Sequence, residues 1–357
     1  MSWEVTRTRQ SRKMSRLASE RGSILVLVLL LMTVLVTMTI SGLRLARVEK
    51  SGAQIMEQRM QAMSLAQSGV RLAEFALLSD LRRDMEKERV DHFGEDWGGF
   101  LLEGSRDLPR MDTGELQGEI MDEQGKFPIN ALLAEGGGWH YEYRQVFHNL
   151  LIGYFALSQE EAETVLQSLK DWMDPDEEPS GLRGAEAEYY EQGSLPWRPR
   201  NEPLRSVAEL RYIRGISAKL YKGAGDALGL KDLVTVHSDG GININTAAKP
   251  LLAALIIQEE ASISRGEAQS FAGRMVSHRE NRMHWDSLSD PQWWTKVAGA
   301  LSVDMHPVIG TTSSVFSVQV KAWAGSVYSQ SYAVLERRSG AEERKSPRVK
   351  RLLYEAR

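Results

Sequence analysis

The chemically densest part of the chain is an acidic stretch near its middle. Residues 171–191 read DWMDPDEEPSGLRGAEAEYYE and carry eight acidic side chains against one basic side chain, Arg183. Carboxylates this close repel one another unless they are protonated, solvated or neutralised by a cation, and Ca²⁺ accepts several oxygen ligands in a flexible geometry. Pro175 and Pro179 prevent a helix from spreading the charges apart. The stretch is therefore either a calcium-binding loop or a solvated acidic loop.

The spacing of these acids is not that of an EF-hand. Counted from Asp174, the sixth position is Pro179, where a glycine is needed, and the twelfth is Ala185, where a glutamate is needed. The pattern alone therefore leaves both the presence of a metal and the identity of its ligands open.

The sequence shows no residue constellation typical of an enzyme. The segment GAGDALG at 223–229 has its third glycine one residue too late for a dinucleotide fingerprint, and no strand precedes it. The seven histidines form no H-E-x-x-H motif, and there is no G-x-S-x-G motif. A membrane-anchored hydrolase would need a nucleophile and a base that the sequence does not offer, so we expect no enzymatic activity.

The elements that position the acidic stretch begin with a membrane helix. Residues 22–43 carry no charge, and about 22 residues at roughly 1.5 Å each cross a hydrocarbon core of about 30 Å. Residues 1–22 hold six basic side chains against two acidic ones, which keeps the N-terminus in the cytoplasm and sends the remaining chain outward. We therefore predict a cytoplasmic leader, 1–22, and a transmembrane segment, 23–43.

The helix is predicted to continue, amphipathic, well beyond the membrane. No proline occurs from Leu43 to about Arg89, and apolar residues recur at steps of three, four or seven. These residues are Met56, Met60, Met63, Val70, Ala73, Leu77 and Leu81. Gly42, Gly52 and Gly69 each cost roughly 1 kcal/mol in a helix interior and mark the points where the helix would bend or melt.

The outward portion is predicted as strands, then helices, then strands. Residues 115–133 begin like a strand, and residues 313–338 alternate like a hairpin around a Gly-Ser turn. Between them five segments show helical periodicity, several with serine caps. The fold class is therefore α+β, with a helical block inserted into a β frame.

Composition adds two limits. The formal net charge of −4 gives no electrostatic reason to expect nucleic-acid binding. The chain has no cysteine, so an exported portion must hold its irregular regions by packing, by a metal or by assembly into something larger.

The sequence also contains a weak internal repeat. Residues 122–134 and 238–255 each hold an acid, a glycine turn, an Ile-Asn pair and the start of an Ala-Leu helix. In a strand-turn-helix connection, an asparagine at this place caps the backbone that follows. We therefore predict that Asn130 and Asn245 are capping residues and not catalytic ones.

Four stretches in combination are typical of one family. They are ERGSILVLVLLLMTVLVTM (20–38), LKDWMDPDEEPSGLRGAEAEYY (169–190), PWRPRNEPLRSVAELRYIRGIS (196–217) and GININTAAKPLLAAL (241–255). With them the chain resembles protein K of type II secretion systems, a family of minor pseudopilins in the type IV pilin-like superfamily. The resemblance covers roughly residues 22–337, and its motifs are specific in combination though weak singly.

The resemblance implies a pilin-like fold. In this fold a long N-terminal helix packs on an antiparallel sheet, and a large α-helical domain similar to helix-hairpin-helix or SAM-like modules is inserted between strands. The expected parts are a leader, a transmembrane segment, a pilin-like helix with first strands, the inserted domain with the acidic loop, C-terminal strands and a disordered basic tail. Their ranges are 1–22, 23–43, 44–135, 136–300, 301–338 and 339–357.

The resemblance also implies processing of the leader. A prepilin peptidase would cleave after Gly22 and methylate the new N-terminus, Ser23. Most pilins carry a glutamate five residues into the mature chain, whereas this sequence has Leu27, as is typical of the K subunit. A tip subunit has no partner above it for that glutamate, and an unpaired carboxylate in a membrane costs at least about 2.5 kcal/mol.

Calcium is the cofactor that the family implies for the acidic loop. Carried over by resemblance, the ligands are Asp171, Asp174, Asp176 and Glu186, and the reserves are Glu178 and Glu188. The ion count and the final ligand set stay open at this point.

The implied function is a minor pseudopilin at the tip of the pseudopilus, which primes assembly and supports protein export. Its partners would be the I and J pseudopilins, indirectly H and the major pseudopilin G, and the inner-membrane assembly platform, with secreted proteins or the outer-membrane secretin as further candidates. It would cross the inner membrane once, with the N-terminus cytoplasmic and the bulk of the chain periplasmic.

One alternative shares the pilin-like start: a membrane-anchored helix-hairpin-helix protein of DNA uptake or of a type IV pilus tip. Such a protein needs a basic groove. Around Lys219, Lys222 and Lys231 the basic charges are few, and Asp226 and Asp232 offset them. We therefore expect no nucleic-acid partner.

Overall fold

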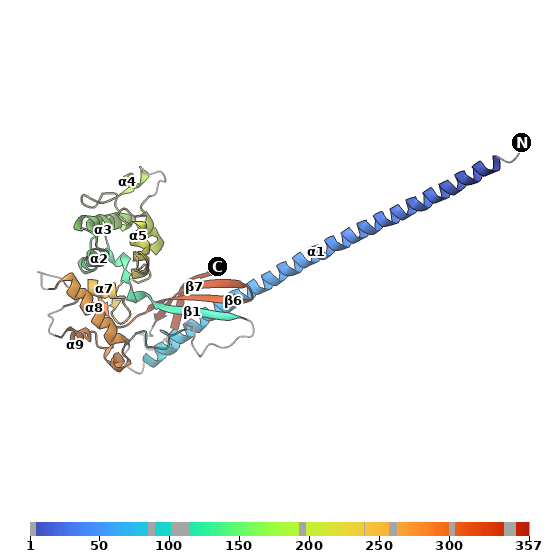
Figure 1. The fold of residues 1–357 in the computed structure, drawn as a ribbon. Coiled ribbons are helices and arrows are strands. Elements are labelled where there is room, and N and C mark those ends of the chain that lie inside the picture. Colours follow the sequence, from blue (N-terminus) through green and yellow to red (C-terminus); the bar gives the residue numbers. More distant parts are fainter. Residues whose placement is uncertain are drawn as a thin grey trace. The chain divides into compact units, whose positions relative to one another are not determined.

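The structure is a computed structural model, and it describes the backbone over most of the chain (Figure 1). The described ranges are 5–84, 90–100, 114–192, 198–238, 240–256, 263–299, 304–338 and 348–356. The chain forms two compact units, one of Met1–Gln61 with Ala324–Val327 and the other of Ala62–Trp323 with Tyr328–Arg357. One long helix contributes residues to both units.

Helix α1, Val5–Asp84, is that helix, and it bears out the prediction of a long N-terminal helix. From Ile24 onward it is long and apolar enough to cross a membrane by length and composition. Within the apolar run, the hydroxyls of Thr33, Thr37 and Thr39 donate to main-chain carbonyls three or four residues earlier, each at 2.8 Å. Hydroxyls satisfied inside their own helix are compatible with a hydrocarbon environment.

The second unit buries one stripe of α1. This stripe consists of Ala62, Ala66, Val70, Ala73, Leu77 and Leu81. The buried face therefore begins between one and two turns later than predicted, because Met56 and Met60 are each 57% exposed and Met63 is 38% exposed. Gly69 lies in the stripe, and a Cβ there would be 2.6 Å from Cγ1 of Val320, so the glycine permits close approach of helix and strand.

A four-stranded sheet packs against that stripe. The strands are β1 Glu115–Asp122, β6 Val315–Ala324, β7 Val327–Arg338 and β8 Arg348–Ala356, in the order β1-β6-β7-β8. β1 pairs antiparallel with β6, and β7 pairs antiparallel with β8. The predicted C-terminal hairpin over 313–338 corresponds to β6 and β7, and the α+β fold with a helix on a sheet is confirmed.

The prediction of a disordered tail over 339–357 is wrong for residues 348–356, which form the edge strand β8. Many basic residues and a proline suggested disorder. In the structure Val349 packs against the core between α1 and the sheet, and the guanidinium of Arg351 binds Glu74 of α1 at 2.6 Å. Pairing with β7 therefore orders this basic segment, while residues 339–347 lie outside the described part of the chain.

The helices α2 to α9 fall between residues 141 and 298, and short 3₁₀ turns and two-residue strands lie between them and on either side of them in the sequence. The helices are α2 Tyr141–Gly153, α3 Gln159–Met173, α4 Ala187–Glu191, α5 Ala218–Lys222, α6 Leu230–Leu233, α7 Lys249–Ala254, α8 Arg265–Glu280 and α9 Trp294–Ala298. The 3₁₀ turns are η1 Glu123–Gly125, η2 Ile129–Leu132, η3 Val207–Tyr212 and η5 Arg282–Ser287. The short strands pair in parallel, β2 Phe127–Pro128 with β3 Val234–Thr235 and β4 Ile242–Asn243 with β5 Ile309–Gly310.

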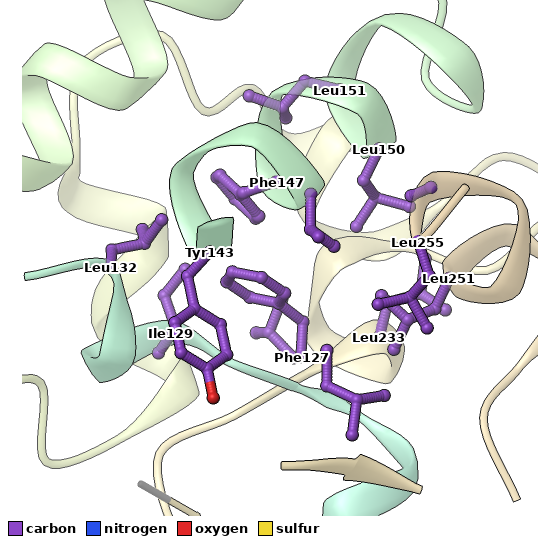
Figure 2. Packing of buried hydrophobic residues seen from close by; sticks show 14 of the residues in the cluster. Phe127, Ile129, Leu132, Tyr143, Phe147, Leu150, Leu151, Leu233, Leu251 and Leu255 are labelled. Atoms are coloured by element: carbon purple, nitrogen blue, oxygen red, sulfur yellow. The ribbon is translucent and has the colours of Figure 1, made fainter. Parts of the chain in front are cut away.

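The helical block has its own apolar core. Phe127 packs against the rings of Tyr143 and Phe147 at the start of α2, with Leu251 and Leu255 in the same cluster (Figure 2). The predicted serine caps are confirmed at α3 and α8, where Ser158 and Ser264 form capping boxes with Glu161 and Glu267. Whether this block is a helix-hairpin-helix module stays a prediction.

The predicted capping roles of Asn130 and Asn245 are wrong. Asn130 pairs with the backbone of Leu204, donating to its carbonyl at 3.0 Å and accepting from its N–H at 2.9 Å. Asn245 donates to the carbonyl of Leu288 and accepts from the indole of Trp293. An amide is both donor and acceptor, so each side chain ties together segments far apart in sequence instead of capping the next helix.

Candidate metal centre

Helix α3 carries the first half of the acidic stretch. The capping box of Ser158 and Glu161 fixes its start. It ends at Met173, because Pro175 disfavours helical geometry at Asp174, which is the C-terminal cap residue. Asp171 therefore lies in the last turn of the helix, with Asp174 one turn beyond it.

Asp171 holds the following loop in place through both of its oxygens. Oδ1 accepts from the backbone N–H of Ser180 at 2.9 Å, and Oδ2 accepts from that of Ala185 at 2.5 Å. A Cβ on Gly184 would lie 2.2 Å from Asp171 Oδ2, so a glycine is needed for this approach. The loop is thus folded back over the end of α3.

Arg214 and Gln167 also hold this loop in place through hydrogen bonds to its backbone. Arg214 donates through Nη1 to the carbonyls of Arg183 and Gly184, at 3.4 and 3.1 Å. Gln167 accepts from the N–H of Arg183 at 2.9 Å. These contacts place Glu186, the residue before α4, beside the end of α3.

Three carboxylates converge at this point. One ligand atom from each of Asp171, Asp174 and Glu186 lies within 4.8 Å of the others. All three residues are buried, with exposed fractions of 0, 1 and 4%. Among the described residues, three of their oxygens have no hydrogen-bond partner: Oδ1 of Asp174 and both oxygens of Glu186.

Burial and crowding disfavour the charged form of these acids. Burial, followed by the charges of Asp171 and Asp174, raises the pKa of Glu186 from 4.5 to about 7. Burial also raises the pKa of Asp174, although the neighbouring Lys170 lowers it. A bound cation would remove this cost, because it stabilises the ionised carboxylates.

One cation of the protein already touches the cluster. The ammonium of Lys170 is 2.6 Å from Oδ2 of Asp174 and 2.9 Å from the hydroxyl of Ser180. The ammonium forms no hydrogen bond with Oδ1 of Asp174 or with the two oxygens of Glu186. The cluster therefore retains buried acceptors that only a further donor or a metal ion would satisfy.

Comparison with known proteins decides the family. Residues 125–225 match the family model "Type II secretion system (T2SS), protein K". The chain is 32% identical over 255 residues to type II secretion system protein K of Pseudomonas aeruginosa, covering 70% of this chain and 71% of that protein. The chain belongs to the type II secretion system protein K family.

Two further similarities agree with the assignment to the protein K family. The protein of Pectobacterium carotovorum subsp. carotovorum is 28% identical over 282 residues, which is 75% of this chain and 78% of that protein. A chain in the crystal structure of the GspK–GspI–GspJ complex from enterotoxigenic Escherichia coli matches with a TM-score of 0.59 at 20% identity. That match covers 85% of this chain and 98% of the other, so the two share a fold.

Of the four ligands that family resemblance implied, the structure brings Asp171, Asp174 and Glu186 together but not Asp176. Asp176 is exposed, and its Oδ1 accepts from the N–H of Glu178 at 2.9 Å. The reserve residues Glu178 and Glu188 are exposed as well. Lys170 and Ser180 were missed from the sequence, although the Lys170–Asp174 spacing of four residues on a helix was a usable signal.

The donor set fits a hard divalent cation. Carboxylate and hydroxyl oxygens suit Ca²⁺ or Mg²⁺, whereas zinc and copper sites favour histidine and cysteine, which this cluster lacks. Asp174 and Glu186 would bind through their unpartnered oxygens. Asp171 already accepts two backbone N–H groups, so its first role is to shape the site.

A second acid cluster, unforeseen from the sequence, lies at the end of α1. One carboxylate oxygen from each of Asp80, Asp91 and Glu95 lies within 4.8 Å of the others, as in the first cluster. Here Arg337 of β7 is fully buried and binds both Asp80, at 2.6 Å, and Asp91. Burial, followed by the charges of the two aspartates, raises the pKa of Glu95 to about 9, so it is protonated at neutral pH.

The predicted processing positions lie on α1. Gly22 and Ser23 come just before Ile24, the first residue whose side chain is described. Lys231, one of the few basic residues in the segment expected to lack a DNA-binding groove, has its Nζ 3.6 Å from Oδ1 of Asp232.

Proposed function

We propose that this protein is a minor pseudopilin at the tip of a type II secretion pseudopilus, where it primes assembly and supports export without catalysing a reaction. Membership of the protein K family carries the proposal. The apolar half of α1 and the helix-on-sheet unit supply the anchor and the body that such a subunit needs.

The I and J pseudopilins are the proposed direct partners, with H, G and the assembly platform reached through them. The similar structure from enterotoxigenic E. coli is of a complex with GspI and GspJ. Beyond the stripe that packs on its own sheet, α1 exposes apolar residues, including Leu72 at 39% and Phe75 at 65%. Such a face suits packing against the helices of neighbouring pseudopilins.

Co-purification tests this assembly. The detergent-solubilised chain is expressed with the I and J pseudopilins of its own secretion system and isolated through a tag on the K subunit. We expect a stable three-protein complex that Phe75→Asp weakens by at least about tenfold, because a charge replaces a buried apolar contact. Met283→Asp, at an 86% exposed residue of η5, is the matched control and should leave the complex intact. No complex from the wild-type chain would contradict the proposal.

The proposed location is the inner membrane, with one span, a cytoplasmic N-terminus and a periplasmic body. Cleavage after Gly22 and methylation of Ser23 are part of this proposal. The mass of the N-terminal peptide tests it: we expect a methylated serine at residue 23 in cells with prepilin peptidase, and the intact leader in Gly22→Leu. An uncleaved wild-type leader would contradict processing.

Calcium binding is the second part of the proposed function. It is supported by the three unpartnered, buried oxygens of Asp174 and Glu186. When bound, Ca²⁺ would link the end of α3 to the residue before α4, because one ligand comes from each. It would stabilise an exported domain that has no disulfide.

A further inference from the structure

Among the described residues, Lys170 is the basic residue that forms a salt bridge with a carboxylate of the candidate metal centre. Its ammonium approaches Oδ2 of Asp174 at 2.6 Å and the hydroxyl of Ser180 at 2.9 Å. The Lys170 side chain is 19% exposed, and that of Asp174 is 0% exposed. This is a partly buried, two-point contact and not a fully solvated ion pair.

We propose that Lys170 is a resident counter-cation that sets both the affinity and the charge selectivity of the metal centre. The inference rests on the proposed calcium site. Asp171, Asp174 and Glu186 supply three negative charges, and Lys170 supplies one positive charge, which leaves a net charge of about −2. That charge balances the charge of a divalent ion.

Two physical effects follow from this position. Lys170 occupies one oxygen of Asp174, so that only Oδ1 is open to a metal. Its charge also repels an incoming cation across a short, partly buried distance, where screening by water is weak. Without a metal, the same contact keeps Asp174 paired and the end of α3 ordered, because an unpaired buried carboxylate is costly.

Removal of this charge should therefore tighten metal binding. In Lys170→Met the net charge of the cluster becomes about −3 and Oδ2 of Asp174 becomes available as a ligand. We expect calcium to bind roughly tenfold more tightly, since ligand charge tunes calcium affinity over several orders of magnitude. Terbium is a trivalent ion of similar coordination chemistry, and its affinity should rise by a larger factor than that of calcium.

The experiment uses the full chain in detergent and the metal ions alone as probes. Calcium binding is measured by equilibrium dialysis, and terbium binding by its luminescence. Four chains are compared: wild type, Lys170→Met, Lys170→Arg, which keeps the charge, and Lys219→Met, which removes an exposed lysine on α5. We expect tighter binding and a raised terbium-to-calcium preference in Lys170→Met alone.

The outcomes separate this inference from the calcium site on which it rests. Equal calcium affinity in wild type and Lys170→Met, or the same gain in Lys219→Met, overturns the role of Lys170 while the site stands. No calcium binding by any chain overturns the site itself. If Lys170→Met does not fold, Lys170→Gln takes its place, because its amide can still donate to Asp174 without a charge.

Discussion

The two acid clusters of this protein have similar members and opposite electrostatic balance. Asp80 and Asp91 at the end of α1 share the buried guanidinium of Arg337, and Glu95 is protonated at neutral pH. At the end of α3, Lys170 binds one oxygen of Asp174, and both oxygens of Glu186 lack a partner among the residues that the structure describes. One cluster is neutralised by the protein, and the other is left incomplete.

The proposed metal site rests on this difference between the two clusters. Three converging carboxylates occur in both places, so their number and spacing do not discriminate. Buried oxygens without a partner do, because a native fold rarely leaves such groups unsatisfied. The loop contacts of Asp171 agree, since they position Glu186 without using its oxygens.

The largest expected effect is on the neutralised cluster. Arg337→Met leaves Asp80 and Asp91 buried without their shared partner, and we expect a loss of roughly 3–5 kcal/mol in the free energy of unfolding. Urea unfolding of the detergent-solubilised chain, followed by tryptophan fluorescence, measures it. A loss below about 1 kcal/mol would show that the guanidinium does not hold this cluster together.

In the cluster at the end of α3, loss of the loop-shaping residue Asp171 should lower stability without metal more than loss of the charge of Asp174. Asp171→Ala removes the acceptor for two backbone N–H groups and should cost about 2–4 kcal/mol in chelator, because buried donors are left unpaired. Asp174→Asn should cost less than this in chelator, because its amide oxygen can still accept from Lys170 and the repulsion among the carboxylates falls, but it should abolish the gain from calcium. Equal losses for both variants in chelator would contradict the division between a loop-shaping residue and a ligand.

The two glutamates should make stability depend on pH in different windows. The folded pKa of Glu186 is raised from 4.5 to about 7, so the folded state binds the extra proton and loses stability as pH rises between these values. The loss should be on the order of 1–3 kcal/mol and vanish in Glu186→Gln or in millimolar calcium. For Glu95 the window extends to about pH 9, and calcium should leave it unchanged. Unfolding curves measured from pH 5 to pH 9 test this. If calcium changed the free energy of unfolding equally below pH 7 and between pH 7 and pH 9, the difference between the two clusters would be contradicted.

The smallest expected effect is at Asp176, the predicted ligand outside the cluster. Its negative charge helps to raise the pKa of Glu186, although its carboxylate is not among the three that converge. Asp176→Asn should therefore change calcium affinity by less than about threefold, because a solvated charge acts weakly at this range. Loss of calcium binding in this variant would return Asp176 to the ligand set.

The sequence was informative where the signal is local. The period of α1, the hairpin of β6 and β7 and the proline-bounded acidic stretch could all be predicted from neighbouring residues. Arg337 could not be paired with Asp80, because 257 residues separate them and only the fold brings them together. Likewise, the loop over residues 180–185 folds back onto Asp171 and brings Glu186, and not Asp176, to the cluster, and composition does not encode that path of the chain.

Thermal unfolding with calcium or chelator tests the central claim most directly. The full chain in detergent is compared with Asp174→Asn/Glu186→Gln and with Glu95→Gln. We predict that millimolar calcium raises the Tm of wild type and of Glu95→Gln by about 3 °C or more and leaves the double variant unchanged. An equal rise in all three chains, or none in wild type, would contradict the assignment of the metal centre to the end of α3.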